Sequence, residues 1–219
     1  MQIVYDEVRW KTLGKLRERA IGILKRLNEL SMVGYVYGSV ARGDVNPTSD
    51  IDIVVLNPNV VLLDLIHVDH KFIIQATPTS TPKVYLALDR DEKEVISFPL
   101  VKLRGMEEEF YKFGGMIGME DLERGLRVVG VNKNLDLIVP NKEGHDQIPL
   151  KGNEDIAIKY LKISPMTLDQ REKLLTRRRE QGRTGTFLRY ELSSEESVQT
   201  AVRDLMKENK FFKRSIDRG

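Results

Sequence analysis

Two carboxylates separated by one isoleucine are the residues of this sequence best suited to chemistry. They are Asp50 and Asp52, at the start of the apolar run 50–56. Alternate residues of a β-strand point to the same face, so the two carboxylates would project together while the isoleucines point into the core. Their repulsion is relieved by a proton or a cation, and hard oxygen ligands suit Mg²⁺ or Mn²⁺. The pair therefore predicts a divalent-metal site that also holds substrate phosphates.

A second group of residues, shortly before the carboxylates, is suited to phosphate binding. Gly38 and Ser39 close a β-branched and aromatic run, residues 32–38. A glycine lets a phosphate approach the backbone, and Ser39 offers a hydroxyl and an N–H at the start of a predicted helix. Arg42 follows one turn later and could hold a phosphate or a leaving pyrophosphate. We expect these side chains to contact a triphosphate.

The string YGSVARGDVNPTSDIDIVVL, residues 37–56, resembles the signature of the polymerase-beta-like nucleotidyltransferase superfamily. That signature is an apolar strand ending in Gly-Ser, a loop, and Asp-apolar-Asp on the next strand. The match is close over residues 33–56 and extends loosely toward residue 100. It implies an α/β nucleotidyltransferase fold, a nucleoside triphosphate substrate and a divalent metal. On matching positions it implies metal ligands at Asp50 and Asp52, and triphosphate contacts at Gly38 and Ser39.

The sequence departs from the family pattern at one position. The resemblance implies a third carboxylate, acting as general base and metal ligand, on the strand after the next helix. The matching run, residues 71–77, carries Gln75, whose amide accepts no proton at neutral pH and is a weak metal ligand. Asp89, at the end of the run 83–89, is the first substitute for this third catalytic acid, and Asp136 is the second. Because this acid is missing from its usual place, a catalytically degenerate protein that binds nucleic acid or regulates stays an open alternative.

Hydrophobic periodicity predicts the elements that position these residues. Apolar residues recur at three- and four-residue steps over residues 5–30, which indicates an amphipathic helix. Alternating or continuous apolar runs indicate strands at residues 32–38, 50–56, 71–77, 83–89 and 94–101. The predicted fold class is α/β (α+β), a nucleotidyltransferase-like mixed sheet flanked by helices, with a smaller and mostly helical C-terminal region.

The chain divides, by this interpretation, into a nucleotidyltransferase-like core at residues 1–115 and a C-terminal region at residues 116–219. The C-terminal region contains a predicted linker near residues 144–152 and a helix-turn-helix-like segment at residues 154–180. A basic tail, residues 210–219, is expected to fray.

A concentrated basic block lies at the end of the helix-turn-helix-like segment. Local blocks of this kind are the usual electrostatic footprint of proteins that bind a polyanion, here RNA or DNA. The block also contains acidic residues, and this mixture of charges is equally typical of a solvent-exposed helix face that binds no polyanion. The block consists of Arg171, Lys173, Arg177, Arg178, Arg179 and Arg183.

Composition limits the remaining classes. The 219 residues carry a formal net charge of +2, no cysteine and three histidines, which excludes a disulfide scaffold and a cysteine nucleophile. Apolar runs are too short for a membrane span and the N-terminus lacks a signal-peptide core, so we expect a cytoplasmic protein.

The function predicted from these features is metal-dependent transfer of a nucleoside monophosphate from a nucleoside triphosphate to a hydroxyl acceptor. The basic block favours a nucleic acid as that acceptor. A nucleotidyltransferase-like partner in a two-protein system, such as a toxin–antitoxin pair, is a third hypothesis, which the length of the chain disfavours.

Overall fold

The computed structural model describes residues 1–182 and 185–219. These residues form two compact units, each assembled from three stretches of the chain. Among the described residues, unit 1 takes 1–25, 35–51 and 104–182, and unit 2 takes 26–34, 52–103 and 185–219. The division expected between residues 115 and 116 stays a prediction.

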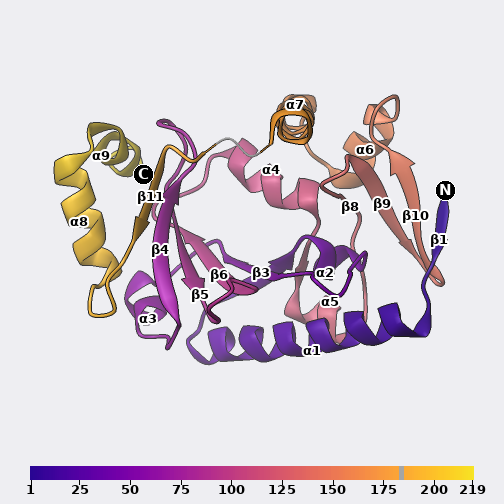
Figure 1. The fold of residues 1–219 in the computed structure, drawn as a ribbon, viewed down its shortest axis with the longest axis horizontal. Coiled ribbons are helices and arrows are strands. Elements are labelled where there is room, and N and C mark those ends of the chain that lie inside the picture. Colours follow the sequence, from indigo (N-terminus) through magenta and orange to yellow (C-terminus); the bar gives the residue numbers. More distant parts are fainter. Residues whose placement is uncertain (183–184) are drawn as a thin grey trace. The chain divides into compact units, whose positions relative to one another are not determined.

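Unit 1 contains a four-stranded antiparallel sheet in the order β1-β10-β9-β8 (Figure 1). The strands of this sheet are β1 (Gln2–Val4), β8 (Gly130–Val131), β9 (Asp136–Asn141) and β10 (Gly144–Pro149). Strands β2 (Gly34–Tyr37) and β7 (Met116–Gly118) pair antiparallel. The helices are α1 (Glu7–Glu29), α2 (Ser39–Arg42), α4 (Gly105–Gly114), α5 (Met119–Glu123), α6 (Glu154–Leu161) and α7 (Pro165–Gln181).

Apolar side chains from helices and strands together bury the core of unit 1. One cluster joins α4, α6 and α7 to the small sheet, and its buried members are Phe113, Val131, Leu137, Leu150, Ala157, Leu161, Ile163, Leu168 and Leu175. Removing these side chains from water is the main driving force that holds the three helices on the sheet. The start of α7 is fixed by Ser164, whose hydroxyl accepts from the Thr167 N–H at 3.2 Å.

Unit 2 contains five neighbouring strands in the order β11-β4-β5-β6-β3. Their bounds are β3 (Ile51–Val55), β4 (His70–Gln75), β5 (Lys83–Ala87), β6 (Glu94–Pro99) and β11 (Leu188–Glu191). The printed registers of β11 with β4, β4 with β5 and β5 with β6 are antiparallel. The helices are α3 (Val60–Asp64), α8 (Val198–Glu208) and α9 (Lys210–Ile216), and α8 packs against α9 (Figure 1).

The predicted α/β fold class is confirmed, because each unit combines a β-sheet with helices. The amphipathic pattern over residues 5–30 forms α1, and the five predicted strands form β2, β3, β4, β5 and β6. The two helices expected within residues 154–180 are α6 and α7.

Two expectations from the sequence are wrong. Most of the segment predicted as a linker, residues 144–152, is β10, which pairs with β9 on one side and β1 on the other. The Asn141 side chain closes the β9–β10 hairpin by accepting from the Glu143 and Gly144 N–H groups at 3.1 and 2.9 Å. The tail expected to fray forms α9, because Asn209 caps the helix and the Phe212 side chain is completely buried.

Candidate active site

The predicted metal ligands lie at the start of β3. Asp50 is the residue before the strand and is exposed, while Asp52 is its second residue and is half-buried. Ile51 and Ile53 are buried, with exposed fractions of 2% and 0%. Burial therefore alternates along residues 50–53 as the sequence predicts, and Asp50 and Asp52 are the more exposed residues of that alternation.

The half-buried Tyr85 is the clearest neighbour of Asp52 within unit 2. Burial first, and then the negative charge of Asp52, raise the pKa of Tyr85 to about 12. Tyr85 lies opposite Ser97 on β6, and the Ser97 hydroxyl donates to the Ile53 carbonyl at 3.2 Å. The Tyr85 phenol stays protonated at neutral pH, so it can donate a hydrogen bond but cannot serve as a base.

Asp89, the first substitute for the third acid, follows β5 in the turn that leads to β6. Its two carboxylate oxygens accept from the Glu94 N–H at 2.7 Å and the Asp91 N–H at 3.2 Å. Asp89 lies four residues beyond Tyr85, roughly 13 Å along an extended chain. The structure therefore gives Asp89 a turn-capping contact, and its role as the third acid stays a prediction.

The other two residues considered for the third acid are also engaged elsewhere. Asp136 lies on β9 of unit 1, where its carboxylate accepts from the Gln147 side chain at 2.8 Å. Gln75 is completely buried at the end of β4, and its amide donates to the Ser215 hydroxyl at 2.9 Å and the Ser80 carbonyl at 3.1 Å. Gln75 thus holds chain segments together inside unit 2.

The Gly-Ser pair joins the end of β2 to α2. Gly38 has a left-handed backbone, with φ 83°, a conformation that a side chain would strain. Its N–H donates to the Gly115 carbonyl at 2.9 Å, which ties the pair to the end of α4. Ser39 is the first residue of α2 and is half-buried.

Arg42 is buried and already fully engaged in unit 1. Its guanidinium forms a two-pronged pair with the Asp44 carboxylate at 2.9 and 3.0 Å and donates to the Gly114 carbonyl at 2.6 Å. A phosphate would have to replace Asp44 to reach this guanidinium. The contact between Arg42 and a triphosphate stays a prediction, and the observed role of Arg42 is to fasten the loop after α2 to α4.

The sequence analysis missed a second buried arginine, Arg17 of α1. Its guanidinium donates to the carbonyls of Val40 at 3.1 Å, Ala41 at 2.9 Å and Leu126 at 2.5 Å. Burial lowers the pKa of Arg17 to about 10. The signal was visible in the sequence, because Arg17 follows Leu13 by one turn on the apolar stripe of the helix.

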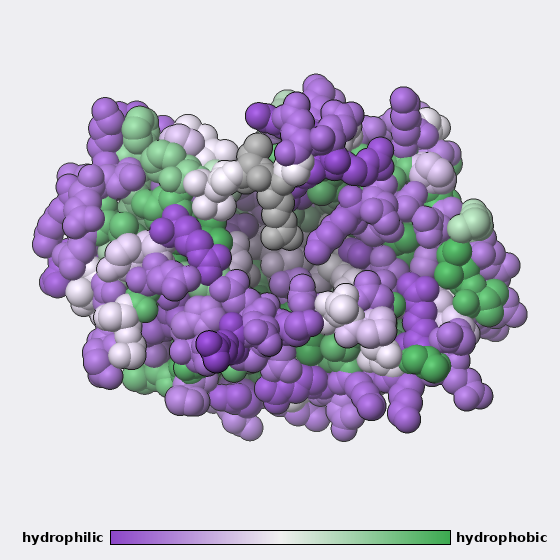
Figure 2. Space-filling model, viewed as in Figure 1, coloured by the Kyte–Doolittle hydropathy of each residue, from purple (hydrophilic) through white to green (hydrophobic). Residues whose placement is uncertain are grey.

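The described members of the predicted basic block lie along α7, and hydrophilic side chains cover the visible surface of this helix (Figure 2). Exposed members are Lys173, Arg177, Arg178 and Arg179, and Arg183 lies outside the described residues. Lys173 pairs with Asp169 at 2.8 Å on the same helix. Arg171 differs from these members, because it is half-buried against α4.

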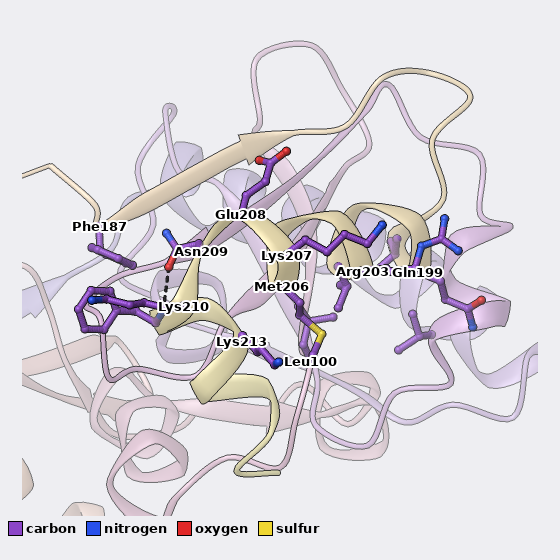
Figure 3. Close-up of a pocket in the computed structure, with 14 residues that line it drawn as sticks. Leu100, Phe187, Gln199, Arg203, Met206, Lys207, Glu208, Asn209, Lys210 and Lys213 are labelled. Atoms are coloured by element: carbon purple, nitrogen blue, oxygen red, sulfur yellow. Dashed lines mark hydrogen bonds between the residues drawn. The ribbon is translucent and has the colours of Figure 1, made fainter.

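Unit 2 carries a separate open groove of about 1200 Å³ along α8 and α9 (Figure 3). Apolar side chains, among them Leu100, Met206 and Phe211, form part of its lining, and Lys207 and Lys213 add positive charge. Every predicted site residue lies outside this lining. The groove therefore contributes nothing to the assignment of the predicted active site.

Searches of the described residues for two further features gave negative results. Within residues 1–182 and 185–219, no group of three or more histidine or acidic side chains is placed to hold a metal ion. In the same residues, no helix has the length and apolar character needed to cross a membrane.

The fold and the motif define a class of protein. An α/β chain with Gly-Ser at the end of one strand and Asp-Ile-Asp on the next has the layout of a nucleotidyl-transferring domain. Residues 17–128 match the family model of the nucleotidyltransferase domain, so the chain belongs to this family. No curated protein and no solved structure matches the chain.

Proposed function

We propose that this protein is a metal-dependent nucleotidyltransferase that moves a nucleoside monophosphate from a nucleoside triphosphate to a hydroxyl acceptor. Family membership supports nucleotidyl transfer as the reaction class. The observation that carries the finer proposal is the pair Asp50 and Asp52, on the polar side of β3 after a Gly-Ser turn. The exposed cations of α7 favour RNA or DNA as the acceptor.

The donor set fits a hard divalent cation. Asp50 and Asp52 supply carboxylate oxygens, and both keep access to solvent. No third acid completes a cluster among the described residues, so substrate phosphates and water would fill the remaining positions, as Mg²⁺ and Mn²⁺ accept. When bound, such a cation supplies neutralisation of the phosphate charge and activation of the attacking hydroxyl.

The residues of the chain then have separate parts in the reaction. Gly38 lets a phosphate approach the backbone, and Ser39 offers its hydroxyl and N–H to the same phosphate. Tyr85 stays protonated beside Asp52, so the proton of the acceptor hydroxyl must go to another group. We retain Asp89 as the proposed general base. The substrate phosphate or water is the alternative acceptor of that proton.

A degenerate nucleotidyltransferase-like protein that binds nucleic acid is the second candidate. The specific observation in its favour is that Asp89 caps a turn, Asp136 receives a hydrogen bond in unit 1, and Gln75 is buried. Such a protein would bind nucleotide or nucleic acid without turnover. We retain the prediction of a cytoplasmic location for either candidate.

Transfer of label from each of four α-labelled triphosphates, with Mg²⁺ or Mn²⁺, tests the proposal. The acceptors to offer are RNA, DNA and the protein itself. Asp52→Asn should reduce transfer about a thousandfold or more if it holds the metal, because several kcal/mol of transition-state stabilisation is lost.

Asp155→Asn, at an exposed position in the first turn of α6, is the matched control and should retain wild-type transfer. Label transfer that survives in Asp52→Asn would contradict the metal assignment. Binding of nucleotide without any transfer by the wild type would favour the degenerate protein.

A further inference from the structure

Arg171 differs from the other cations of α7 in its surroundings. Its guanidinium carbon lies 4.6 Å from the ring centre of Phe110 and 5.7 Å from that of Phe113, both on α4. Its neighbour Lys173 is exposed and pairs with Asp169. The guanidinium of Arg171 is thus held on an aromatic surface inside unit 1, where its position is defined by packing.

This half-buried cation has no anionic partner in the part of the chain that the structure describes. Arg171 makes no ion pair and no hydrogen bond there, and its Nε is buried without an acceptor. Glu109, on the same face of contact between α4 and α7, instead accepts from Ser164 and Thr167. Burial, and then the positive charge of Arg178, lower the pKa of Arg171 to about 10.

An unpaired cation in such a place costs stability, because burial removes water without supplying a counter-charge. The attraction between the guanidinium and the ring of Phe110 offsets only a part of that cost. A guanidinium carries its N–H groups in one plane and in parallel pairs, which match the oxygens of a phosphate.

The position of Arg171 relates it to the Gly-Ser turn. The Phe110 ring lies 6.3 Å, centre to centre, from the ring of Tyr37, the residue before Gly38. α4, which carries Phe110, ends at Gly114, and the carbonyl of the next residue, Gly115, accepts from the Gly38 N–H at 2.9 Å. Phe110 therefore lies about one helical turn before the end of α4.

We propose that Arg171 binds a phosphate group through its guanidinium, which Phe110 holds in place. The phosphate comes either from the nucleoside triphosphate or from the backbone of a nucleic-acid acceptor. This inference rests on the proposed function, since the phosphate that it invokes belongs to a substrate of that reaction. It also separates Arg171 from Arg177, Arg178 and Arg179, whose exposed side chains meet solvent.

Binding measurements on the full chain test the assignment. The probes are a Mn²⁺–nucleoside triphosphate, a single-stranded oligonucleotide and inorganic tripolyphosphate, titrated into wild type, Arg171→Met, Arg171→Lys and the control Arg26→Met, an exposed arginine of α1. Arg171→Met should weaken binding of the phosphate source about 10- to 100-fold, the value of one or two charge-assisted hydrogen bonds. Arg171→Lys should lie between, because lysine keeps the charge and loses the planar fork.

The three probes separate the possible outcomes. A loss confined to the triphosphate and tripolyphosphate assigns Arg171 to the nucleotide, and a loss confined to the oligonucleotide assigns it to the acceptor. Equal affinities of Arg171→Met and wild type for all three overturn the inference. If wild type binds no nucleoside triphosphate, the proposed function fails, and the oligonucleotide and tripolyphosphate titrations alone decide the role of Arg171. No binding of any probe by wild type overturns both.

Thermal unfolding distinguishes anion binding by Arg171 from a role in packing alone. If Arg171 only packs, its replacement by methionine lowers Tm. If Arg171 binds an anion and is unpaired without it, Arg171→Met leaves Tm unchanged or raises it, because the unpaired charge is removed. A triphosphate that binds at Arg171 should then raise the Tm of wild type more than that of Arg171→Met.

Discussion

Replacement of Arg17 by methionine should loosen α2 and destabilise unit 1. The guanidinium of Arg17 donates three hydrogen bonds to the carbonyls of Val40, Ala41 and Leu126. Charge-assisted bonds of this kind contribute about 1.5–3 kcal/mol each, so their sum sets an upper limit near 9 kcal/mol. Methionine also removes the cost of burying a cation, which is several kcal/mol. We expect a net loss of about 3 kcal/mol in the free energy of unfolding.

Urea and thermal unfolding of Arg17→Met measure this loss. For a chain of this size, a loss of about 3 kcal/mol corresponds to a Tm lower by about 6–12 °C. Arg17→Lys should lose less, because lysine keeps the charge and reaches fewer carbonyls. The matched control is Lys25→Met, which breaks an exposed pair with Glu123 at 3.2 Å and should change stability by less than about 0.5 kcal/mol.

A result in which Arg17→Met unfolds with wild-type stability would refute the reasoning. It would mean that water satisfies the three carbonyls as well as the guanidinium does. A loss equal to that of Lys25→Met would lead to the same conclusion.

Three further predictions concern parts of the fold away from α2. Hydrogen bonds from Thr167 first, and then from Ser164, lower the pKa of Glu109 below its ordinary value of 4.5. A lowered folded pKa contributes stability that is present above the unfolded pKa and is lost as pH falls through the folded pKa. Wild type should therefore be more stable than Glu109→Gln at pH 7. Urea unfolding should show that this difference in stability shrinks from pH 7 to pH 3, and a constant difference would contradict the prediction. Gly144→Ala should lower the free energy of unfolding by about 1–3 kcal/mol, because the added Cβ meets the Ile3 carbonyl and the Tyr5 ring. Faster hydrogen exchange of the β1 amides would report the displaced strand, and unchanged exchange would contradict the prediction. Ser215→Ala should lower the free energy of unfolding by about 1 kcal/mol, because it removes one hydrogen-bond acceptor of the buried Gln75 amide. A double-mutant cycle with Gln75→Ala should show that the two stability losses are coupled, and additive losses would show that this hydrogen bond contributes little.

Local patterns made most of the fold predictable. The spacing of apolar residues defined α1 and the strands β2 to β6, because burial on one face imposes a period that is visible in the sequence. The strand β10 was missed because its residues are mostly polar and half-exposed, and its partner β1 lies at the other end of unit 1 in the sequence. Nothing local in GHDQIP shows that a strand from the N-terminus will pair with it.

The candidate site was predictable in part for a similar reason. The types and spacing of Asp50 and Asp52 follow from the strand period, and the burial of Ile51 and Ile53 agrees with it. The partners of the arginines depend on the tertiary fold. Arg42 binds the Gly114 carbonyl from a segment 72 positions away, so its engagement could not be read from the motif.

The pairing of β11 with β4 has a consequence for the order in which the chain folds as it is synthesised. Leu188 lies opposite Gln75, and Gln75 also binds Ser215, 140 residues later. Until β11 has left the ribosome, β4 presents an unpaired edge beside the apolar side chains Phe72 and Ile73. Contacts of such large sequence separation form slowly, so a nascent or C-terminally truncated chain should be the form most exposed to aggregation and proteolysis. The segment that carries β11 thus covers the edge of β4, a strand made about 110 residues earlier, which corresponds to roughly five to twenty seconds of synthesis.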